Sequence, residues 1–309
     1  MYEQTIGHSI TCSGLGLHTG RKVKLSLHPL PPRSGIVWSI QSQSRGGEYV
    51  QLSPHNVVDT TLCTCLEHNG VRVGTVEHVM AAIRGLGIDN LLVKVQGPEV
   101  PIMDGSAASF VHLFKQAGQR KQSRPKHVYV LKHKVKIEDK GKAITARPGK
   151  TMQVHYTIDF PHPMVGRQEA SYAPGEQDFI RDVSRARTFG FLKEVEMLQR
   201  QGLALGGSLE NALVFDQTGV INTEGFRYPD EPVRHKILDF IGDIGLLPYP
   251  ILGTFDVFCS GHALNTAFAR YLADHKDDVL DLVEMRSLPH KPLAHFFAAD
   301  RDHTVMASA

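Results

Sequence analysis

The sequence has few cysteines, almost no net charge and no long apolar run. Its 309 residues include four cysteines, and 34 basic against 32 acidic side chains leave a formal charge of +2. So few cysteines in a chain of this length predict buried free thiols rather than a disulfide framework. Cys63 and Cys65 are separated by one residue, which is not the C-x-x-C spacing of redox or zinc-knuckle sites. The cysteines therefore indicate no redox centre.

The balanced charge and the short apolar runs exclude further classes of protein. A charge of +2 creates no overall field that attracts nucleic acid, so any basic site must be local. No apolar run approaches the length that spans a bilayer, and residues 1–14 lack the basic start and apolar core of a secretory signal. We expect a cytoplasmic protein with no transmembrane segment and no nucleic-acid partner. Since no heptad pattern is present, we also expect a monomer.

Alternating apolar residues are the main signal of secondary structure. They predict strands over residues 21–29, 91–97, 127–139 and 151–160. Helical spacing predicts a helix over 75–87, with Thr75 as its N-cap, and another over 106–118 that ends at Gly118. Because strands and helices do not alternate regularly, the pattern favours an α+β fold over a doubly wound parallel sheet.

A polar stretch divides the chain into two halves. Residues 121–127 are polar and contain a proline, and a new strand pattern follows at once. We therefore place a domain boundary near Arg124, giving a first α+β domain over 1–124 and a second over 125–309. Each half contains an apolar, glycine-punctuated helix with a histidine near its start, EHVMAAIRGLGI and RHKILDFIGDIG. This loose match suggests two related halves packed face to face.

A polar stripe interrupts the apolar pattern of the second of these helices. In VRHKILDFIGDIG, His235 and Asp239 are four residues apart, so they share one helix face, and Asp243 continues it. One helix can supply two metal ligands at this spacing. An isolated H-x-x-x-D pattern is more often an ion pair or a solvated face, so the stripe alone does not establish a site.

A carboxylate and an imidazole stand side by side at the start of the other helix. A water-activating zinc site needs three protein ligands, an open position and a nearby base, and His78, His235 and Asp239 with Glu77 would supply that set. Two imidazoles and one carboxylate suit zinc, although iron or another divalent ion also fits. Even when the other helix is considered, a capped and exposed helix start is an equally good interpretation of Glu77 and His78.

Another histidine, His262, follows Gly261 at a third predicted helix start. A general acid must be protonated before it acts, and a helix N-terminus lowers the pKa of a histidine. Asp243 is the candidate carboxylate to offset that effect. In a chain with 17 histidines, a structural role for His262 is the simpler alternative.

The segment 184–215 is rich in apolar residues without an obvious polar face. Within it, the hydroxyl of Thr188 could donate to a developing oxyanion, and Phe189 and Phe191 could line a groove for a long apolar ligand. Ordinary core packing of these residues is the alternative.

Taken together, these motifs resemble the zinc-dependent UDP-3-O-acyl-N-acetylglucosamine deacetylases of lipid A biosynthesis in Gram-negative bacteria. The resemblance extends over nearly the whole chain, in order, through GLGLHTG, LCTCL, TVEHVMAA, GLGIDN, PIMDGSA, TIDFPHP, SRARTFGF, LALGGS, VRHKILDFIGD and SGHALN. It implies two β-α-α-β domains that form a layered sandwich, each with a small insert.

The resemblance also implies roles for individual residues. The implied Zn²⁺ ligands are His78, His235 and Asp239, and the implied catalytic residues are Glu77 as general base, Thr188 at the acetyl carbonyl, His262 as general acid oriented by Asp243, and Lys236 near the substrate. The implied substrate-binding residues are Asp159 and Phe160 on the nucleotide side, with Phe189, Phe191 and Gly207. An insert at about 190–222 would hold the 3-O-acyl chain. Two positions depart from the family: Cys259 replaces a lysine of some members, and Pro161 a polar residue.

The implied reaction is hydrolysis of the acetamido group of a UDP-linked acylated glucosamine, giving acetate and a free amine. One alternative keeps the zinc site but takes a peptide or another acylated sugar amide as substrate. A second alternative is a regulator or carbohydrate-binding module without catalysis, in which the polar stripe is a salt-bridged helix face.

Overall fold

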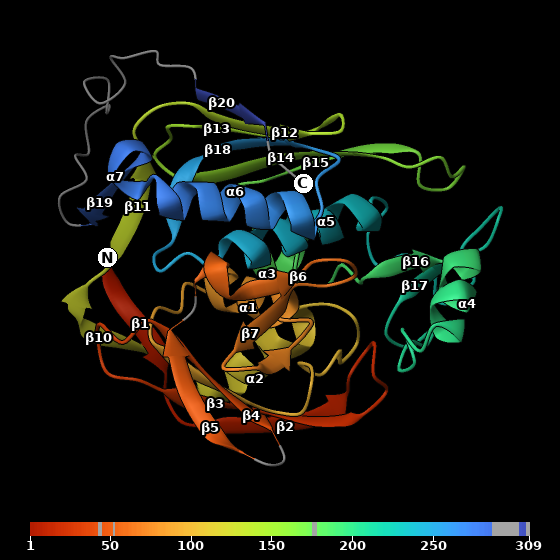
Figure 1. The fold of residues 1–309 in the computed structure, drawn as a ribbon, viewed down its shortest axis with the longest axis horizontal. Coiled ribbons are helices and arrows are strands. Elements are labelled where there is room, and N and C mark those ends of the chain that lie inside the picture. Colours follow the sequence, from red (N-terminus) through yellow and green to blue (C-terminus); the bar gives the residue numbers. More distant parts are fainter. Residues whose placement is uncertain (43–44, 52, 175–177, 286–302, 307–309) are drawn as a thin grey trace.

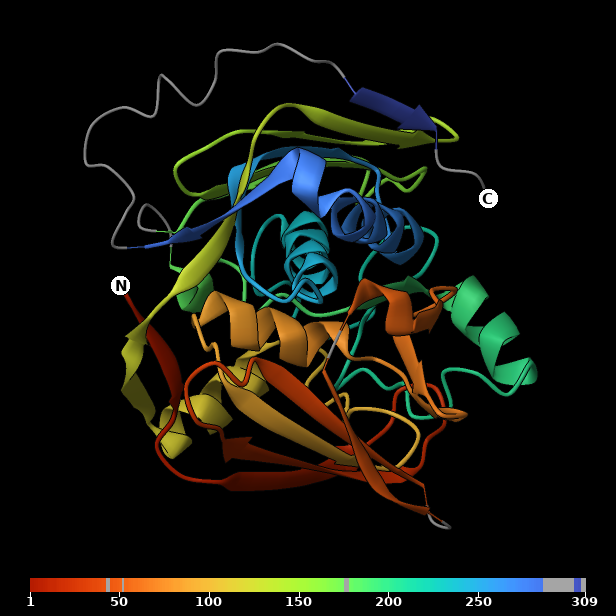
Figure 2. The same cartoon turned by 60° about the vertical axis from the view of Figure 1, so that its left-hand side comes forward.

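Two sheets form the outer layers of the protein, and helices fill the space between them (Figures 1 and 2). The fold is taken from a computed structural model that describes residues 1–42, 45–51, 53–174, 178–285 and 303–306. Helices α1 and α2 cover the sheet of the first half, and α5 and α6 cover the sheet of the second half. The two helix layers meet at the centre, so any residue at that contact lies between both halves of the chain.

The first half of the chain forms the smaller of the two outer sheets. Its elements are β1 (Tyr2–Ile6), β2 (Ile10–Leu15), β3 (Lys22–Pro29), β4 (Ile36–Ser42), β5 (Arg45–Gln51), a 3-10 turn η1 (Pro54–Asn56), β6 (Val57–Asp59), β7 (Cys65–His68), β8 (Val71–Val73), α1 (Glu77–Gly85), β9 (Leu91–Gln96), α2 (Ala108–Ala117) and β10 (Gln119–Pro125). The main sheet has the order β2-β3-β9-β4-β5, in which only β9 and β4 run parallel. In β3, Val23, Leu25 and Leu27 face the core, whereas Lys22 and Lys24 face solvent, as the alternation of the strand predicts.

The second half forms the larger sheet. Its elements are β11 (His127–Leu131), β12 (Val135–Asp139), β13 (Lys142–Arg147), β14 (Met152–Asp159), β15 (Arg167–Tyr172), α3 (Phe179–Asp182), β16 (Phe189–Phe191), α4 (Leu192–Arg200), β17 (Leu213–Phe215), α5 (Glu231–Ile244), β18 (Ile251–Phe258), α6 (His262–Asp274), α7 (Lys276–Val279), β19 (Leu280–Glu284) and β20 (His303–Met306). The strand order is β15-β14-β18-β13-β12-β20, and β11 joins through β18 and β19. The sheets are mixed and the helices lie on their inner faces, which confirms the α+β class.

Two smaller units extend from the layers. Strands β6, β7 and β8 form a three-stranded sheet in the first half. In the second half, β16 and β17 pair in parallel, and α4 packs beside them at the edge of the molecule (Figure 1). No residue of α4 is buried, so this helix contributes little to the core.

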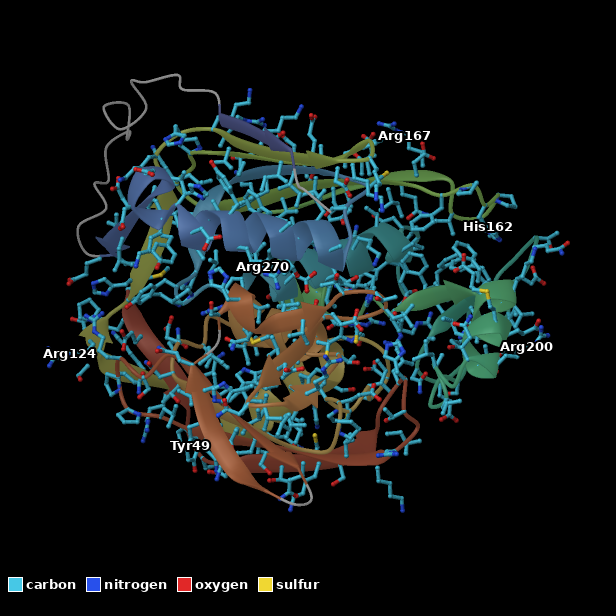
Figure 3. The ribbon with its side chains drawn as sticks, in the orientation of Figure 1. Tyr49, Arg124, His162, Arg167, Arg200 and Arg270 are labelled. Atoms are coloured by element: carbon cyan, nitrogen blue, oxygen red, sulfur yellow. The ribbon has the colours of Figure 1, made fainter. Side chains whose placement is uncertain are left out.

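Contacts between the halves are made by arginines as well as by helices. Arg84 of α1 donates to the carbonyl of Gly245 at 2.9 Å, and Arg270 of α6 donates to the carbonyls of Pro54 and Val57. Arg270 lies where the two halves meet (Figure 3). The division into domains at Arg124 stays a prediction; β10, which contains this residue, pairs with β1, whereas β11 pairs with β18 and β19.

Three details of the sequence prediction were wrong. The run 127–139 is not one strand, because the chain bends after Leu131 and β12 takes different partners from β11. Thr75 does not cap α1: it adopts a left-handed backbone with φ of 57°, its hydroxyl donates to Glu99, and the N-cap is Val76. The four cysteines are free, but they are half-buried rather than fully buried.

Within the described residues, none of the helices combines the length and the apolar character needed to cross a bilayer.

Candidate metal centre and active site

The site lies where α1 crosses α5. A Cβ added at Gly242 of α5 would stand 2.1 Å from the backbone carbonyl oxygen of Glu77, the first residue of α1. Only glycine allows the two backbones to approach this closely. Because the contact is made by Glu77 itself, it sets the distance between the start of α1 and the polar stripe of α5.

Replacing Gly242 by alanine should therefore destabilise the protein and separate the two helices. The methyl group would have to displace backbone rather than a flexible side chain, and overpacking of this kind costs about 1–3 kcal/mol. Chemical denaturation followed by circular dichroism measures the loss. Gly219→Ala is the matched control, since the nearest atom to its added Cβ is an Asp216 oxygen at 3.9 Å. Equal stabilities of the two variants would contradict the close crossing.

Three buried side chains converge at this crossing. Nε2 of His235 lies 3.3 Å from Oδ1 of Asp239, and Nε2 of His78 lies 3.7 Å from the same oxygen. One ligand atom from each of the three lies within 4.8 Å of the others, and each residue is at most 3% exposed. The i, i+4 spacing on α5 brings His235 and Asp239 together, and α1 adds His78 from the other half. This group could hold a metal ion.

The state of each side chain fits metal binding. Oδ1 of Asp239 is buried and accepts no hydrogen bond from the described residues, which leaves a carboxylate oxygen for a cation. Nδ1 of His235 lies 3.0 Å from the carbonyl oxygen of Ala186, and donation to that oxygen leaves Nε2 free to ligate. Burial, with a contribution from His235, lowers the pKa of His78 to about 3, so its imidazole is neutral, as a ligand must be.

Glu77 is the first residue of α1 and directly precedes His78. It is 3% exposed, and its Oε2 accepts the backbone N–H of Thr64 at 3.1 Å. Burial raises its pKa to about 7, although the positive charge of His262 opposes the shift. A carboxylate with a pKa near 7 suits a general base that works at neutral pH.

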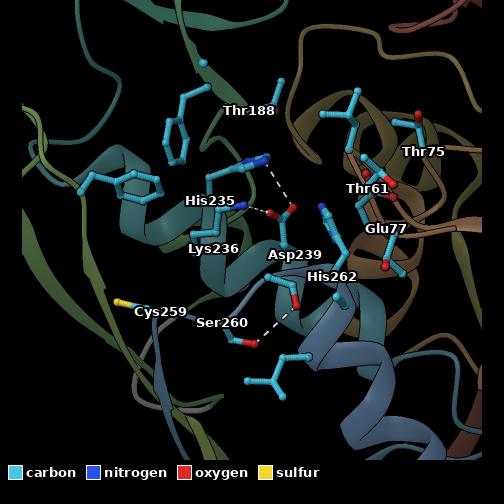
Figure 4. Close-up of a pocket in the computed structure, with 18 of the residues that line it drawn as sticks. Thr61, Thr75, Glu77, Thr188, His235, Lys236, Asp239, Cys259, Ser260 and His262 are labelled. Carbon is cyan, nitrogen blue, oxygen red and sulfur yellow. Dashed lines mark hydrogen bonds and ion pairs between the residues drawn. The ribbon is translucent and has the colours of Figure 1, made fainter. Parts of the chain in front are cut away.

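His262 faces the pocket from the start of α6 (Figure 4). Its Nδ1 lies 2.9 Å from Oδ2 of Asp243, a residue with no exposed surface. Burial lowers the pKa of His262, but the charge of Asp243 and the hydrogen bond to it outweigh burial and raise the pKa to about 9. The imidazole is therefore protonated at neutral pH, as the sequence argument about the helix N-terminus required.

One pocket with a volume of about 700 Å³ is lined by Glu77, His78, His235, Asp239 and His262, whereas Asp243 lies behind His262. The wall of the pocket also includes Thr188, Lys236 and three phenylalanines, which are Phe160, Phe189 and Phe191. The backbone N–H of Thr188 donates to Gly105 at 2.7 Å, which fixes the threonine against the first half. Nζ of Lys236 donates to Oδ2 of Asp239 at 2.8 Å. The pocket is thus lined by charged side chains and by aromatic side chains, and it suits a ligand with both a polar and an apolar part.

Two predicted substrate residues do not line this pocket. Asp159 is exposed at the end of β14, one residue before Phe160, and Gly207 lines a different cavity together with Leu205 and Asp104. Their roles stay predictions. Cys259 does line the pocket, next to Ser260.

Several residues of the site were missed by the sequence argument. Thr64 and Asn265 both donate to Asp243, at 2.5 and 2.8 Å. The guanidinium of Arg187 has no exposed surface and pairs with Glu231 at 2.8 Å. In the sequence, Arg187 lies between Thr188 and Ala186, whose carbonyl oxygen accepts a hydrogen bond from Nδ1 of His235. Thr64 and Arg187 fall inside the motifs LCTCL and SRARTFGF, but nothing in their local pattern indicated these partners.

Comparison with known proteins identifies the family of the chain. The family model described as UDP-3-O-acyl N-acetylglycosamine deacetylase matches residues 3–274. A UDP-3-O-acyl-N-acetylglucosamine deacetylase of Oleidesulfovibrio alaskensis is 47% identical over 308 residues, covering 100% of this chain and 97% of the relative. Proteins of the same name from Nitratidesulfovibrio vulgaris and Myxococcus xanthus are each 48% identical, over 95% and 87% of this chain and 95% and 85% of their own length. The chain therefore belongs to the UDP-3-O-acyl-N-acetylglucosamine deacetylase family.

Proposed function

We propose that the protein is a zinc-dependent amidohydrolase that removes the acetyl group of UDP-3-O-[(3R)-3-hydroxyacyl]-N-acetylglucosamine, releasing acetate and a free amine. The observation that carries the proposal is the buried cluster of His78, His235 and Asp239, flanked by Glu77 on one helix and His262 on another. The names of the relatives support the substrate. We also propose that the reaction takes place in the cytoplasm, as the deacetylation step of lipid A biosynthesis.

Each polar group has a separate task in this reaction. A zinc ion held by the three ligands would act as a Lewis acid toward the acetyl carbonyl and make a water molecule more acidic. Glu77 takes a proton from the water molecule as the oxygen of that water adds to the carbonyl carbon. The Thr188 hydroxyl donates to the carbonyl oxygen as it gains negative charge. His262 gives its proton to the nitrogen as the carbon–nitrogen bond breaks, because an amide anion is a very poor leaving group.

The remaining residues would bind the substrate. Lys236 and the aromatic residues line the same pocket as the catalytic groups, so they are placed to contact the sugar and the start of the acyl chain. The segment 190–222, which contains α4, would hold the rest of that chain. We assign the nucleotide to the side of Asp159 and Phe160.

A deacetylation assay on the UDP-linked substrate with a series of acyl lengths tests the proposal. We expect turnover that requires about one zinc per chain, stops when a chelator removes the metal, and falls steeply when the acyl chain is shortened. Turnover independent of acyl length would favour another acylated amide as substrate. Protein purified without metal and inactive after zinc addition would favour a binding module.

A further inference from the structure

Thr64 connects parts of the site that lie far apart in the sequence. It precedes β7 in the first half of the chain and has no exposed surface. The mechanism proposed above assigns it no task. Its backbone N–H and carbonyl oxygen nevertheless bond to residues at the start of α1, and its hydroxyl bonds to Asp243, the partner of the general acid His262.

The backbone of Thr64 holds the start of α1. Its N–H donates to Oε2 of Glu77 at 3.1 Å, and its carbonyl oxygen accepts the N–H of Val76 at 3.4 Å. Val76 is the N-cap of α1 and has no side-chain cap. Thr64 therefore supplies an acceptor that the helix lacks and fixes one oxygen of the base.

The side chain of Thr64 holds the partner of the acid. Its hydroxyl donates to Oδ1 of Asp243 at 2.5 Å and lies 3.4 Å from Nδ1 of His262. The other oxygen of Asp243, Oδ2, binds Nδ1 of His262 and the amide of Asn265. Each carboxylate oxygen thus has its own donors, and the plane of the carboxylate is set by Thr64 on one side and Asn265 on the other.

We propose that Thr64 is a positioning residue that holds the general base and the general acid in fixed positions relative to each other. Its backbone N–H donates to Glu77, and its hydroxyl donates to Asp243, the partner of the acid. This inference rests on the proposed function. Without the hydroxyl, Oδ1 would be buried and unpaired, and Asp243 could rotate toward other donors. His262 would then lose the fixed direction in which it delivers its proton. Valine has the shape of threonine without the hydroxyl, whereas serine keeps the hydroxyl.

The first test compares Thr64→Val with Thr64→Ser in the zinc-loaded protein. We expect Thr64→Val to lower kcat roughly 10- to 100-fold, the usual effect of losing an orienting partner, with KM and metal content unchanged. Thr64→Ser should recover most of the loss. Thr5→Val is the matched control, because Thr5 is equally buried and its hydroxyl donates at 2.5 Å to the carbonyl of Asn90, outside the site. It should change stability but not kcat.

The second test does not depend on turnover. In the proton NMR spectrum, the downfield Nδ1 proton of His262, assigned by its loss in His262→Ala, should shift or broaden in Thr64→Val and stay in place in Thr64→Ser. Thr64→Ala serves if the valine variant does not fold. A folded hydroxyl-free variant with normal kcat, or with an unchanged His262 proton, would overturn the inference. If the wild-type protein lacks deacetylase activity, the proposed function fails and the NMR comparison still decides the role of Thr64.

Discussion

His78→Ala should abolish metal binding and turnover together. The variant leaves two ligands, both on α5, whereas a catalytic zinc site needs three. The loss of activity should exceed the roughly 10²- to 10³-fold cost of removing one transition-state hydrogen-bond donor, because the Lewis acid itself is lost. Metal analysis by mass spectrometry after dialysis, followed by the deacetylation assay, measures both effects in the same sample.

Thermal unfolding separates loss of metal from loss of fold. Zinc that binds only the native state raises the Tm of the wild-type protein, and His78→Ala should no longer respond to added zinc. His155→Ala is the control, since His155 is exposed on β14 and its Nδ1 contacts Ser171. A His78→Ala protein that keeps one zinc per chain and normal turnover would remove His78 from the ligand set.

The sequence predicted the local part of this site well. Spacing on a single helix depends only on helix geometry, so His235, Asp239 and Asp243 could be placed on one face of α5 before the fold was known. The alternation of β3 likewise fixed which of its side chains face the core. The starts of two further helices then supplied Glu77, His78 and His262 as candidates, and all three line one pocket.

The long-range part could not be predicted in the same way. The contact between Thr64 and Asp243 joins residues 179 positions apart, and a single threonine in a short loop has no periodicity that reveals its partner. The crossing of α1 and α5 depends on Gly242, whose absence of a side chain matters only once Glu77 is known to lie against it. The left-handed backbone of Thr75 also departs from local preference, and the Thr75 hydroxyl donates to Glu99, which lies 24 residues further along the chain.

Glu77→Gln should keep the metal and lose turnover by about 10²- to 10⁴-fold, the usual contribution of a general base. Glutamine has the size of glutamate, and its side-chain oxygen can still accept the N–H of Thr64. It cannot accept a proton from water at neutral pH. The loss should therefore appear in kcat, with the metal content and the Tm close to those of the wild-type protein.

Glu67→Gln is the matched control for this variant. Glu67 lies on β7, where it pairs with Arg72 and does not line the pocket. Its replacement removes the same charge from the same half of the chain, so any general effect of charge appears in both variants. Normal turnover in Glu77→Gln would show that another group takes the proton. Loss of both zinc and turnover is the result expected for a metal ligand, as in His78→Ala. If Glu77→Gln also lost its zinc, Glu77 would belong to the metal site.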